Sequence, residues 1–520
     1  MRLACVLSLP ATLFLLAAGS HAQEPVTPPA APPAPESNAR CTYRLAYAAD
    51  GATEVQVTLE CRDLPAGRHT FVMPRAIPMG YGEQPYDKYV RELRAASGAD
   101  VPFRVEREST DLAATDKAAP RWRLDPPAVP GATLERIEYA VDLAAMEREI
   151  LGASDASKVR PGYVGLLGYS VFGYIEGYEN EPLQLEVTAP ADWPVFTTLA
   201  PKAPADTGAT KAYAGDFYAL ADSQILLGPN LNLRRTDAEV PLFVAIYAEG
   251  AVDHARVAVE AEVTMERIID YFDFPVFNHY TVHMELLKPV SPQHQYFFSM
   301  EHLNSSTFYL GHEDGLRADS PVANVTGVRY NFAHHFAHAW IPKRAYGEGY
   351  FPHLWETAPV LDTIWFSEGF AQYAAMDALA DALHDEGPVF RQRMVQRRFR
   401  ATLTEVPPFL LRLPLVEVSR IASTRYSEDF RTGRAAFSRG GLMAAEMDER
   451  IRSASGGKKR LRDALRYLVR WGLREKRGFR IDELPAIFAE ATGVDTRDIL
   501  EKWLAPYKPP TPQPASTLSQ

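Results

Sequence analysis

Two histidines four positions apart, His334 and His338, have the spacing that chemistry at a metal ion requires. On a helix, residues at this spacing share one face, so both imidazoles can direct a nitrogen at the same cation. A carboxylate, Glu368, follows within the apolar run 364–370, and a carboxylate in apolar surroundings is costly unless it is paired or bound to a metal. His334, His338 and Glu368 therefore form a candidate zinc site with one coordination position left open.

The residue between the two histidines departs from the expected chemistry. His335 occupies the place at which the metallopeptidase pattern H-E-x-x-H has a glutamate that takes a proton from zinc-bound water. Loss of a general base typically costs on the order of 10²–10⁴ in rate, which predicts lost or reduced hydrolysis. Imidazole, with an ordinary pKa of ~6.5, can itself serve as a base, so His335 is a candidate catalytic residue. His335 and His338 also share a helix face, which leaves them open as an alternative ligand pair.

The residues around this pattern resemble those of the glycyl-aminopeptidase family of zinc metallopeptidases (metallopeptidase family sixty-one), which are thermolysin-like gluzincins. In that family an H-E-x-x-H-x-W helix precedes a Lys-Arg pair and then a W-x-S-E-G segment that carries the third ligand. This chain has Trp340, the pair Lys343-Arg344 and the segment 365–369, ending in Ser367-Glu368-Gly369, in the same order. The resemblance implies Zn²⁺ as the cofactor and the amino termini of peptides or proteins as the partners.

A second segment extends the resemblance toward the substrate. Ser299-Met300-Glu301-His302 resembles the family's G-L-E-H segment, which lies on the edge strand along which substrate docks. The resemblance implies that Glu301 receives the substrate's free amino group, as a catalytic and substrate-binding residue, and that His302 also contributes to substrate binding. The alternative for Glu301 is an ordinary carboxylate in solvent at the end of a strand. Phe437 is a further departure, because it stands where an aromatic hydroxyl is expected beside a late helix.

Three functional hypotheses follow. The first is a zinc metallo-aminopeptidase-like protein whose hydrolytic activity is lost or reduced by the exchange at His335. The second is a pseudoenzyme, a pseudopeptidase that uses the old cleft to bind peptide ends or a protein partner. The third, an active hydrolase with an altered base, differs from the first only in the role of His335.

Composition and the N-terminus indicate the compartment. The chain has 520 residues, 46% of them hydrophobic, and a net charge of −11, which gives no basic surface for nucleic acid. Residues 1–22 have the form of a signal peptide: Met1-Arg2, an apolar run and a small-residue cleavage site. No later segment is apolar for long enough to span a membrane. We therefore expect an exported protein, periplasmic or secreted, of unknown oligomeric state.

Cys41 and Cys61 are the cysteines that remain beyond the expected signal peptide. Two strand-like runs flank the turn signal Asp50-Gly51, and a hairpin folded about this turn sets the two cysteines opposite each other. An oxidising compartment favours a disulfide, and two unpaired buried cysteines are the alternative.

The remaining patterns predict a multidomain chain. A Pro/Ala-rich linker (23–40) precedes an N-terminal all-β sandwich of antiparallel strands (41–250), in which short alternating runs include 54–59, 136–141 and 240–246. From 251 to 508 we expect a thermolysin-like α+β catalytic domain with a C-terminal helical bundle. It contains a helix over 255–272, a strand over 280–287 and a helix over 362–383. The proline-rich tail (509–520) is expected to be disordered.

Overall fold

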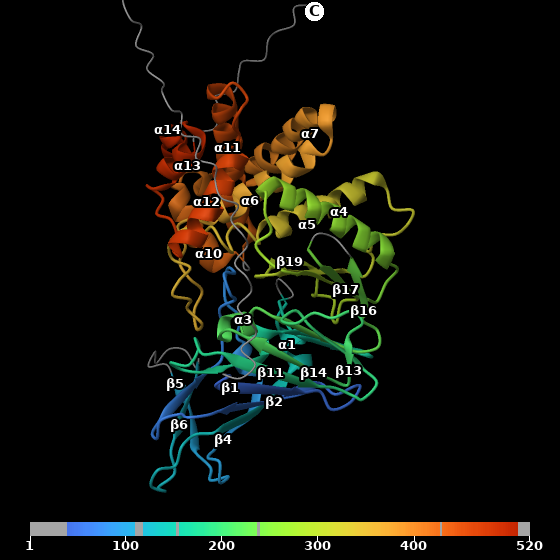
Figure 1. The fold of residues 1–520 in the computed structure, drawn as a ribbon, viewed down its shortest axis with the longest axis vertical. Coiled ribbons are helices and arrows are strands. Elements are labelled where there is room, and N and C mark those ends of the chain that lie inside the picture. Colours follow the sequence, from blue (N-terminus) through green and yellow to red (C-terminus); the bar gives the residue numbers. More distant parts are fainter. Residues whose placement is uncertain (1–38, 110–117, 152–154, 237–239, 427–428, 508–520) are drawn as a thin grey trace, which may run out of the picture.

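The computed structural model describes residues 39–109, 118–151, 155–236, 240–426 and 429–507. The expected signal peptide (1–22), most of the expected linker (23–40) and the expected tail (509–520) lie outside the described residues. Figure 1 shows β-sheets at one end of the long axis, helices at the other, and one further sheet between them. This is the predicted combination of an N-terminal β region with an α/β region that ends in helices.

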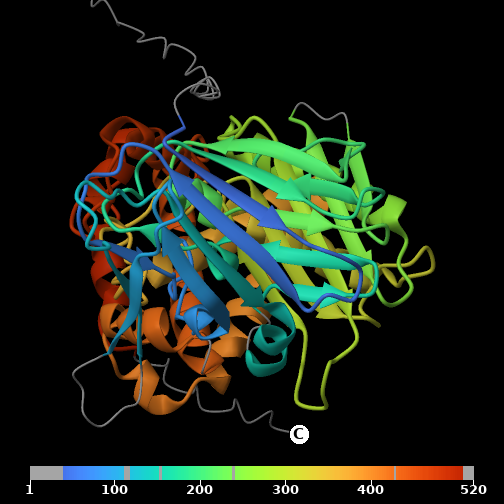
Figure 2. The same cartoon turned by 90° about the horizontal axis from the view of Figure 1, so that it is seen from below.

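Three sheets build the N-terminal part (Figure 2). The first has the order β14-β11-β1-β2-β7-β4, with bounds Ala209–Ala214, Leu183–Thr188, Cys41–Ala46, Glu54–Cys61, Arg136–Asp142 and Val90–Ala96. The second has the order β10-β3-β6-β5, with bounds Tyr174–Ile175, His69–Val72, Ala118–Asp125 and Arg104–Ser109. The third has the order β13-β12-β15-β9-β8, with bounds Asp206–Thr207, Pro194–Thr197, Gln224–Leu227, Tyr163–Leu167 and Lys158–Arg160.

The pairing within these sheets departs from the prediction at one place. β1 pairs antiparallel with β2, as the hairpin predicts, but it pairs parallel with β11 on its other side. A parallel pair requires a long crossover connection, and the chain between β2 and β11 supplies it. The sandwich is therefore not purely antiparallel.

A fourth sheet carries the remaining strands, in the order β16-β17-β18-β20-β19, with bounds Asn232–Thr236, Leu242–Ala248, Tyr280–Leu287, Ser305–Gly311 and Phe297–Glu301. The sequence places the domain boundary at residue 250, yet β17 pairs in parallel with β18. The run 240–246 has the local character of the earlier strands, but its partner lies beyond the predicted boundary. The fourth sheet therefore begins at Asn232, and its strands lie on both sides of the predicted boundary.

Helices cover this fourth sheet and form the far end of the molecule (Figure 1). Three short helices lie in the N-terminal part: α1 (Leu143–Glu149), α2 (Gly168–Val171) and α3 (Phe217–Ala221). The next three carry or support the predicted site: α4 (His254–Phe272), α5 (Val322–Ala337) and α6 (Ile364–Asp381). The others are α7 (Gly387–Met394), α8 (Ala401–Glu405), α9 (Pro408–Leu411), α10 (Leu415–Arg425), α11 (Phe430–Ala454), α12 (Leu461–Glu475), α13 (Leu484–Thr492) and α14 (Arg497–Leu504).

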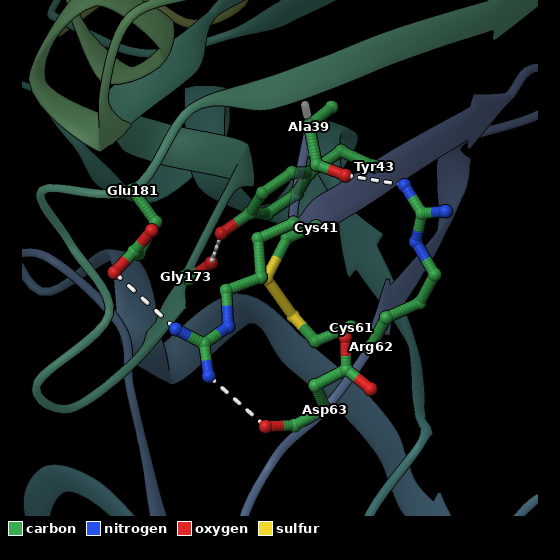
Figure 3. Close-up of a disulfide and its surroundings, with 9 residues drawn as sticks. Ala39, Cys41, Tyr43, Cys61, Arg62, Asp63, Gly173 and Glu181 are labelled. Atoms are coloured by element: carbon green, nitrogen blue, oxygen red, sulfur yellow. Dashed lines mark hydrogen bonds and ion pairs between the residues drawn. A yellow bond between two sulfur atoms is a disulfide. The ribbon is translucent and has the colours of Figure 1, made fainter. Parts of the chain in front are cut away.

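A disulfide joins Cys41 and Cys61 at paired positions of β1 and β2 (Figure 3), with an S–S distance of 2.02 Å. Next to it, the Arg62 guanidinium donates to the backbone carbonyl of Ala39 at 2.6 Å. The first residues of the described chain are thus attached to the hairpin covalently and by hydrogen bonds.

Candidate metal centre

Three elements position the predicted site residues. Helix α5 carries His334 and His335 in its last turn, and His338 caps its C-terminus. Glu368 lies in the second turn of α6, and Glu301 is the last residue of the edge strand β19. The structure brings all five side chains together, because ligand atoms of His334, His335 and His338 lie within 4.8 Å of one another, as do those of Glu301, His338 and Glu368.

The three predicted ligands have the tightest geometry. His334 Nε2 lies 3.2 Å from His338 Nε2, and Glu368 Oε2 lies 3.4 Å from the first nitrogen and 3.7 Å from the second. Tetrahedral zinc with bonds of about 2.0–2.1 Å separates its ligand atoms by roughly 3.4 Å. The spacing of these donor atoms therefore fits a single zinc ion.

Hydrogen bonding selects the ligand nitrogen of His338. Its Nδ1 lies 2.8 Å from the backbone carbonyl of Ile341, and since a carbonyl only accepts, Nδ1 must donate. In the neutral ring Nε2 is then unprotonated, and it lies 3.2 Å from His334 Nε2 and 3.7 Å from Glu368 Oε2. A second partner that fixes the tautomer in this way is typical of metal-binding histidines.

Burial controls the charges at the site. It lowers the pKa of His334 to about 4, and it also lowers the pKa of His338. Both rings are therefore neutral near pH 7, which is the form that binds a metal. Burial raises the pKa of Glu368 to about 7; His338 opposes this rise and Glu301 adds to it. A carboxyl held so far above its ordinary pKa is one that a bound cation would stabilise in the ionised form.

His335 shares the face of the site but not the contact with Glu368. Its side chain is buried and packs edge-on against Phe308, with ring centroids 5.3 Å apart. Its Nδ1 has no hydrogen-bond partner among the described residues and lies 3.9 Å from Glu301 Oε2. Burial and the two neighbouring histidines hold the pKa of His335 well below its usual value. The contacts of Glu368 with His334 and His338 favour these two as ligands over the alternative pair that includes His335.

Glu301 and His302 have different surroundings although they are adjacent. Glu301 is 4% exposed and faces the candidate ligands, so it is not a strand-end carboxylate in solvent. His302 is fully buried, with Nδ1 2.9 Å from Asp222 Oδ1 and Nε2 3.4 Å from Thr307 Oγ1. Both of its ring nitrogens have partners within the protein, which indicates a structural role for His302, and its contact with substrate stays a prediction.

In the Lys-Arg pair after α5, Lys343 is buried and Arg344 is half-buried, and both side chains donate to backbone carbonyls. Lys343 Nζ donates to the backbone carbonyl of Pro78 at 2.9 Å, and Arg344 donates to the carbonyl of Leu303 at 2.7 Å. Trp340 stacks on Phe272 of α4, with ring centroids 4.9 Å apart. These contacts attach the end of α5 to α4, to the loop that follows β19 and to the N-terminal part.

Close backbone packing sets the position of Glu368. A Cβ on Gly440 of α11 would lie 1.9 Å from the backbone oxygen of Trp365 in α6, and a Cβ on Gly369 would lie 2.5 Å from the Gly440 carbonyl carbon. Only glycine allows α6 and α11 to approach this closely. Glu368 immediately precedes the contact, so this packing fixes its distance from α5.

Three further residues lie near the site although the sequence motifs do not include them. Tyr81 and Tyr350 interact electrostatically with Glu368, and Asp222 holds His302. Tyr81 and Asp222 belong to the N-terminal part, far from 334–368 in the chain, and only the fold brings them there. A single sequence carries no signal for such contacts.

Comparison with known proteins agrees with this architecture. Residues 42–229 match the family model described as the peptidase M61 N-terminal domain. No curated protein sequence matches the chain.

Solved structures cover nearly the whole chain. An aminopeptidase N family protein from Idiomarina loihiensis aligns over 90% of this chain and 76% of its own, with a TM-score of 0.74 and 19% identity. An M1 zinc metallopeptidase from Deinococcus radiodurans aligns over 92% of this chain and 95% of its own, with a TM-score of 0.51 and 16% identity. A variant of that enzyme bound to a Tyr-Ser-Ala substrate gives a TM-score of 0.52. The chain therefore has the fold of the M1 aminopeptidase-like structures, and its residues 42–229 are similar to the peptidase M61 N-terminal domain.

Proposed function

We propose that this protein is a zinc metallo-aminopeptidase-like member of the M61 peptidases, with hydrolytic activity that is lost or reduced at His335. The observation that carries this proposal is the set of three donor atoms from His334, His338 and Glu368, which are 3.2–3.7 Å apart. Zinc bound by this set would polarise a peptide carbonyl and lower the pKa of water to about 7.

The residues of the chain divide the remaining tasks. Glu301 lies at the end of the edge strand β19 with its carboxyl directed toward the ligands, and it is placed to bind the ammonium group of a peptide. An N-terminal ammonium paired there would put the first peptide bond close to Glu368. His335 occupies the place of the proton acceptor with an imidazole, whose unpartnered Nδ1 is the group available for that task.

The experiment compares wild type with His335→Glu. Purified protein is analysed for bound zinc and assayed for hydrolysis of aminoacyl anilides. We expect zinc in both proteins and a rate in His335→Glu higher by on the order of 10²–10⁴. Robust wild-type activity, left unimproved by the substitution, would show that His335 serves as the base, and absence of zinc would contradict the proposal.

A second candidate function is that of a peptide-binding pseudopeptidase. The single observation that favours it is that His335 stands where the metallopeptidase pattern has its glutamate base. It predicts that wild type binds peptides with a free amino terminus more tightly than their N-acetylated forms, without cleaving them. Calorimetry on wild type and Glu301→Gln tests this preference, which the substitution should abolish.

Export is also part of the proposal. The disulfide between Cys41 and Cys61 supports an oxidising compartment. None of the helices among the described residues is long and apolar enough to cross a membrane. Mass analysis of protein from the culture supernatant and periplasm would locate the mature N-terminus, expected near residue 23.

A further inference from the structure

A segment of the N-terminal part reaches into the candidate metal centre. Residues 73–85 connect β3 with the short helix that starts at Tyr86, and they are hydrogen-bonded both to the N-terminal part and to the second half of the chain. The Pro78 carbonyl accepts from Lys343 Nζ at 2.9 Å, and the Gly82 amide donates to the Ser423 carbonyl at 3.0 Å. The backbone carbonyl of Trp355 accepts from two further amides of the segment. We call residues 73–85 the insertion loop.

The insertion loop packs closely against the strand that carries Glu301. A Cβ on Gly80 would lie 3.5 Å from the Met300 methyl group and 2.9 Å from the Ile77 side chain. Met79, with φ of 53°, is 1% exposed and belongs with Tyr81 to the hydrophobic core of the helical half. The loop is therefore held in place from both sides and presents Tyr81 at a fixed position.

The Tyr81 hydroxyl is a buried polar group that lacks a partner. The residue is 9% exposed, and its oxygen makes no hydrogen bond with any described residue. The oxygen nevertheless lies close enough to Tyr350 and Glu368 for a poorly aligned hydrogen bond with each, and Glu301 also interacts with it electrostatically. The Tyr350 hydroxyl is already bonded to Ser367 Oγ, at 2.7 Å. An unsatisfied buried hydroxyl costs about 1–3 kcal/mol, so its retention beside the ligands indicates a partner that arrives with substrate.

The chemistry of the site identifies that partner. Glu301 and Glu368 are acceptors when ionised, and the neutral rings of His334 and His338 direct lone pairs at the metal position. A peptide carbonyl that is attacked there develops negative charge on its oxygen, and this charge requires a hydrogen-bond donor. A phenol with an ordinary pKa of about 10 is protonated at neutral pH and donates.

We infer that Tyr81 donates this hydrogen bond, so that the N-terminal part supplies a residue of the catalytic site that the helical half lacks. The inference rests on the proposed function. Because the insertion loop is anchored to Lys343 and Ser423, the donor is in place before substrate binds. Tyr426, at the end of α10, is the competing candidate: its ring packs edge-on against Tyr81, 6.1 Å between centroids, and it also lies in the field of Glu368.

The test measures binding and not turnover, so it works with a weakly active protein. Zinc-loaded wild type, Tyr81→Phe and Tyr426→Phe are titrated with an aminoacyl phosphinate, whose tetrahedral acid group imitates the attacked carbonyl, and with the corresponding alkylamine, which lacks that group. Tyr271→Phe is the matched control, because it also removes a buried hydroxyl without a partner, but one that lies beside Asp377 and Asp448 in the helical region.

We expect Tyr81→Phe to weaken phosphinate binding roughly a hundredfold, with alkylamine binding, zinc content and the midpoint of thermal unfolding close to those of Tyr271→Phe. Equal phosphinate affinity in wild type and Tyr81→Phe, with zinc bound, would overturn the role of Tyr81 and leave the proposed function standing. A loss in Tyr426→Phe alone would assign the donor to α10 and overturn the inference as well. A wild-type protein that holds no zinc would overturn the proposed function and this inference with it.

Discussion

At the residue scale, the site depends on what stabilises the buried carboxylate of Glu368. Glu368 lies against two neutral imidazoles, and burial raises its pKa to about 7. Glu301 adds a second carboxylate nearby. A buried carboxylate is costly unless it is paired or bound to a metal, and zinc bound here would offset that cost.

The first prediction separates the two possible ligand groups. Glu368→Gln and His334→Ala should each abolish stoichiometric zinc binding, because each removes a donor atom from the set spaced 3.2–3.7 Å apart. Glu301→Gln should retain zinc, since we propose that Glu301 binds the substrate's amino group and not the metal. Metal analysis after dialysis against a weak chelator gives the answer, with His312→Ala, on a loop away from the site, as control.

The opposite pattern would be informative. Retention of zinc by His334→Ala together with loss by Glu301→Gln would assign the metal to Glu301, His338 and Glu368, which also lie within 4.8 Å of one another.

At the element scale, local pattern was a good guide wherever the element is determined locally. The expected helix 255–272 corresponds to α4 (His254–Phe272), and the expected strand 280–287 is β18. The spacing of His334 and His338 and the apolar run around Glu368 likewise indicate α5 and α6. The local pattern does not predict which strands pair over a long distance. The sequence of β17 resembles that of the strands before it, but β17 hydrogen-bonds to β18. The place of Tyr81 beside Glu368 has the same origin, because it depends on how the insertion loop folds back.

The contact between α6 and α11 gives a prediction at this scale. Gly440→Ala should lower the free energy of unfolding by about 1–3 kcal/mol, as overpacking does, because its Cβ would meet the Trp365 carbonyl oxygen at 1.9 Å. The resulting shift of α6 should also weaken zinc binding at Glu368. Gly327→Ala is the matched control: it lies in α5 with nothing within 4 Å of the added Cβ.

The control variant should be neutral or more stable by up to about 1 kcal/mol, because alanine favours helix. Chemical denaturation of both variants measures the difference. Equal stability of Gly440→Ala and Gly327→Ala would contradict the claim that the α6–α11 contact requires glycine.

At the scale of the whole molecule, a buried charged cluster joins the N-terminal part to the fourth sheet. Glu285 of β18 accepts from the Tyr163 hydroxyl of β9 at 2.8 Å and lies 3.4 Å from Lys158 Nζ of β8. His283 Nε2 lies 3.2 Å from the same carboxylate. These four side chains are at most 1% exposed, so the cluster ties the two parts into one unit and supports the placement of the insertion loop.

The pH dependence of stability tests this cluster. Burial alone would raise the pKa of Glu285, but Lys158 and His283 outweigh it and lower the pKa to about 2. A carboxyl with a lowered folded-state pKa stabilises the protein above its unfolded pKa of about 4.5 and loses this contribution as the pH falls toward 2.

Glu285→Gln should therefore lower the free energy of unfolding by about 3–5 kcal/mol at neutral pH, as breaking a buried pair does. The difference in the free energy of unfolding between wild type and Glu285→Gln should become smaller below pH 4.5, by at most about 1.4 kcal/mol per pH unit. Denaturation at pH 7, 5, 4 and 3 measures it, and a difference that is independent of pH would contradict the ionised cluster.

We propose that His334, His338 and Glu368 hold zinc in one site. X-ray absorption spectroscopy of the zinc-loaded full chain reports the ligand types and distances directly. We expect two imidazole nitrogens and carboxylate or water oxygen at about 2.0–2.2 Å, with one imidazole lost in His338→Ala. A protein that binds no zinc at stoichiometric amounts, or a spectrum with three imidazoles that loses one in His335→Glu, would contradict the assigned ligand set.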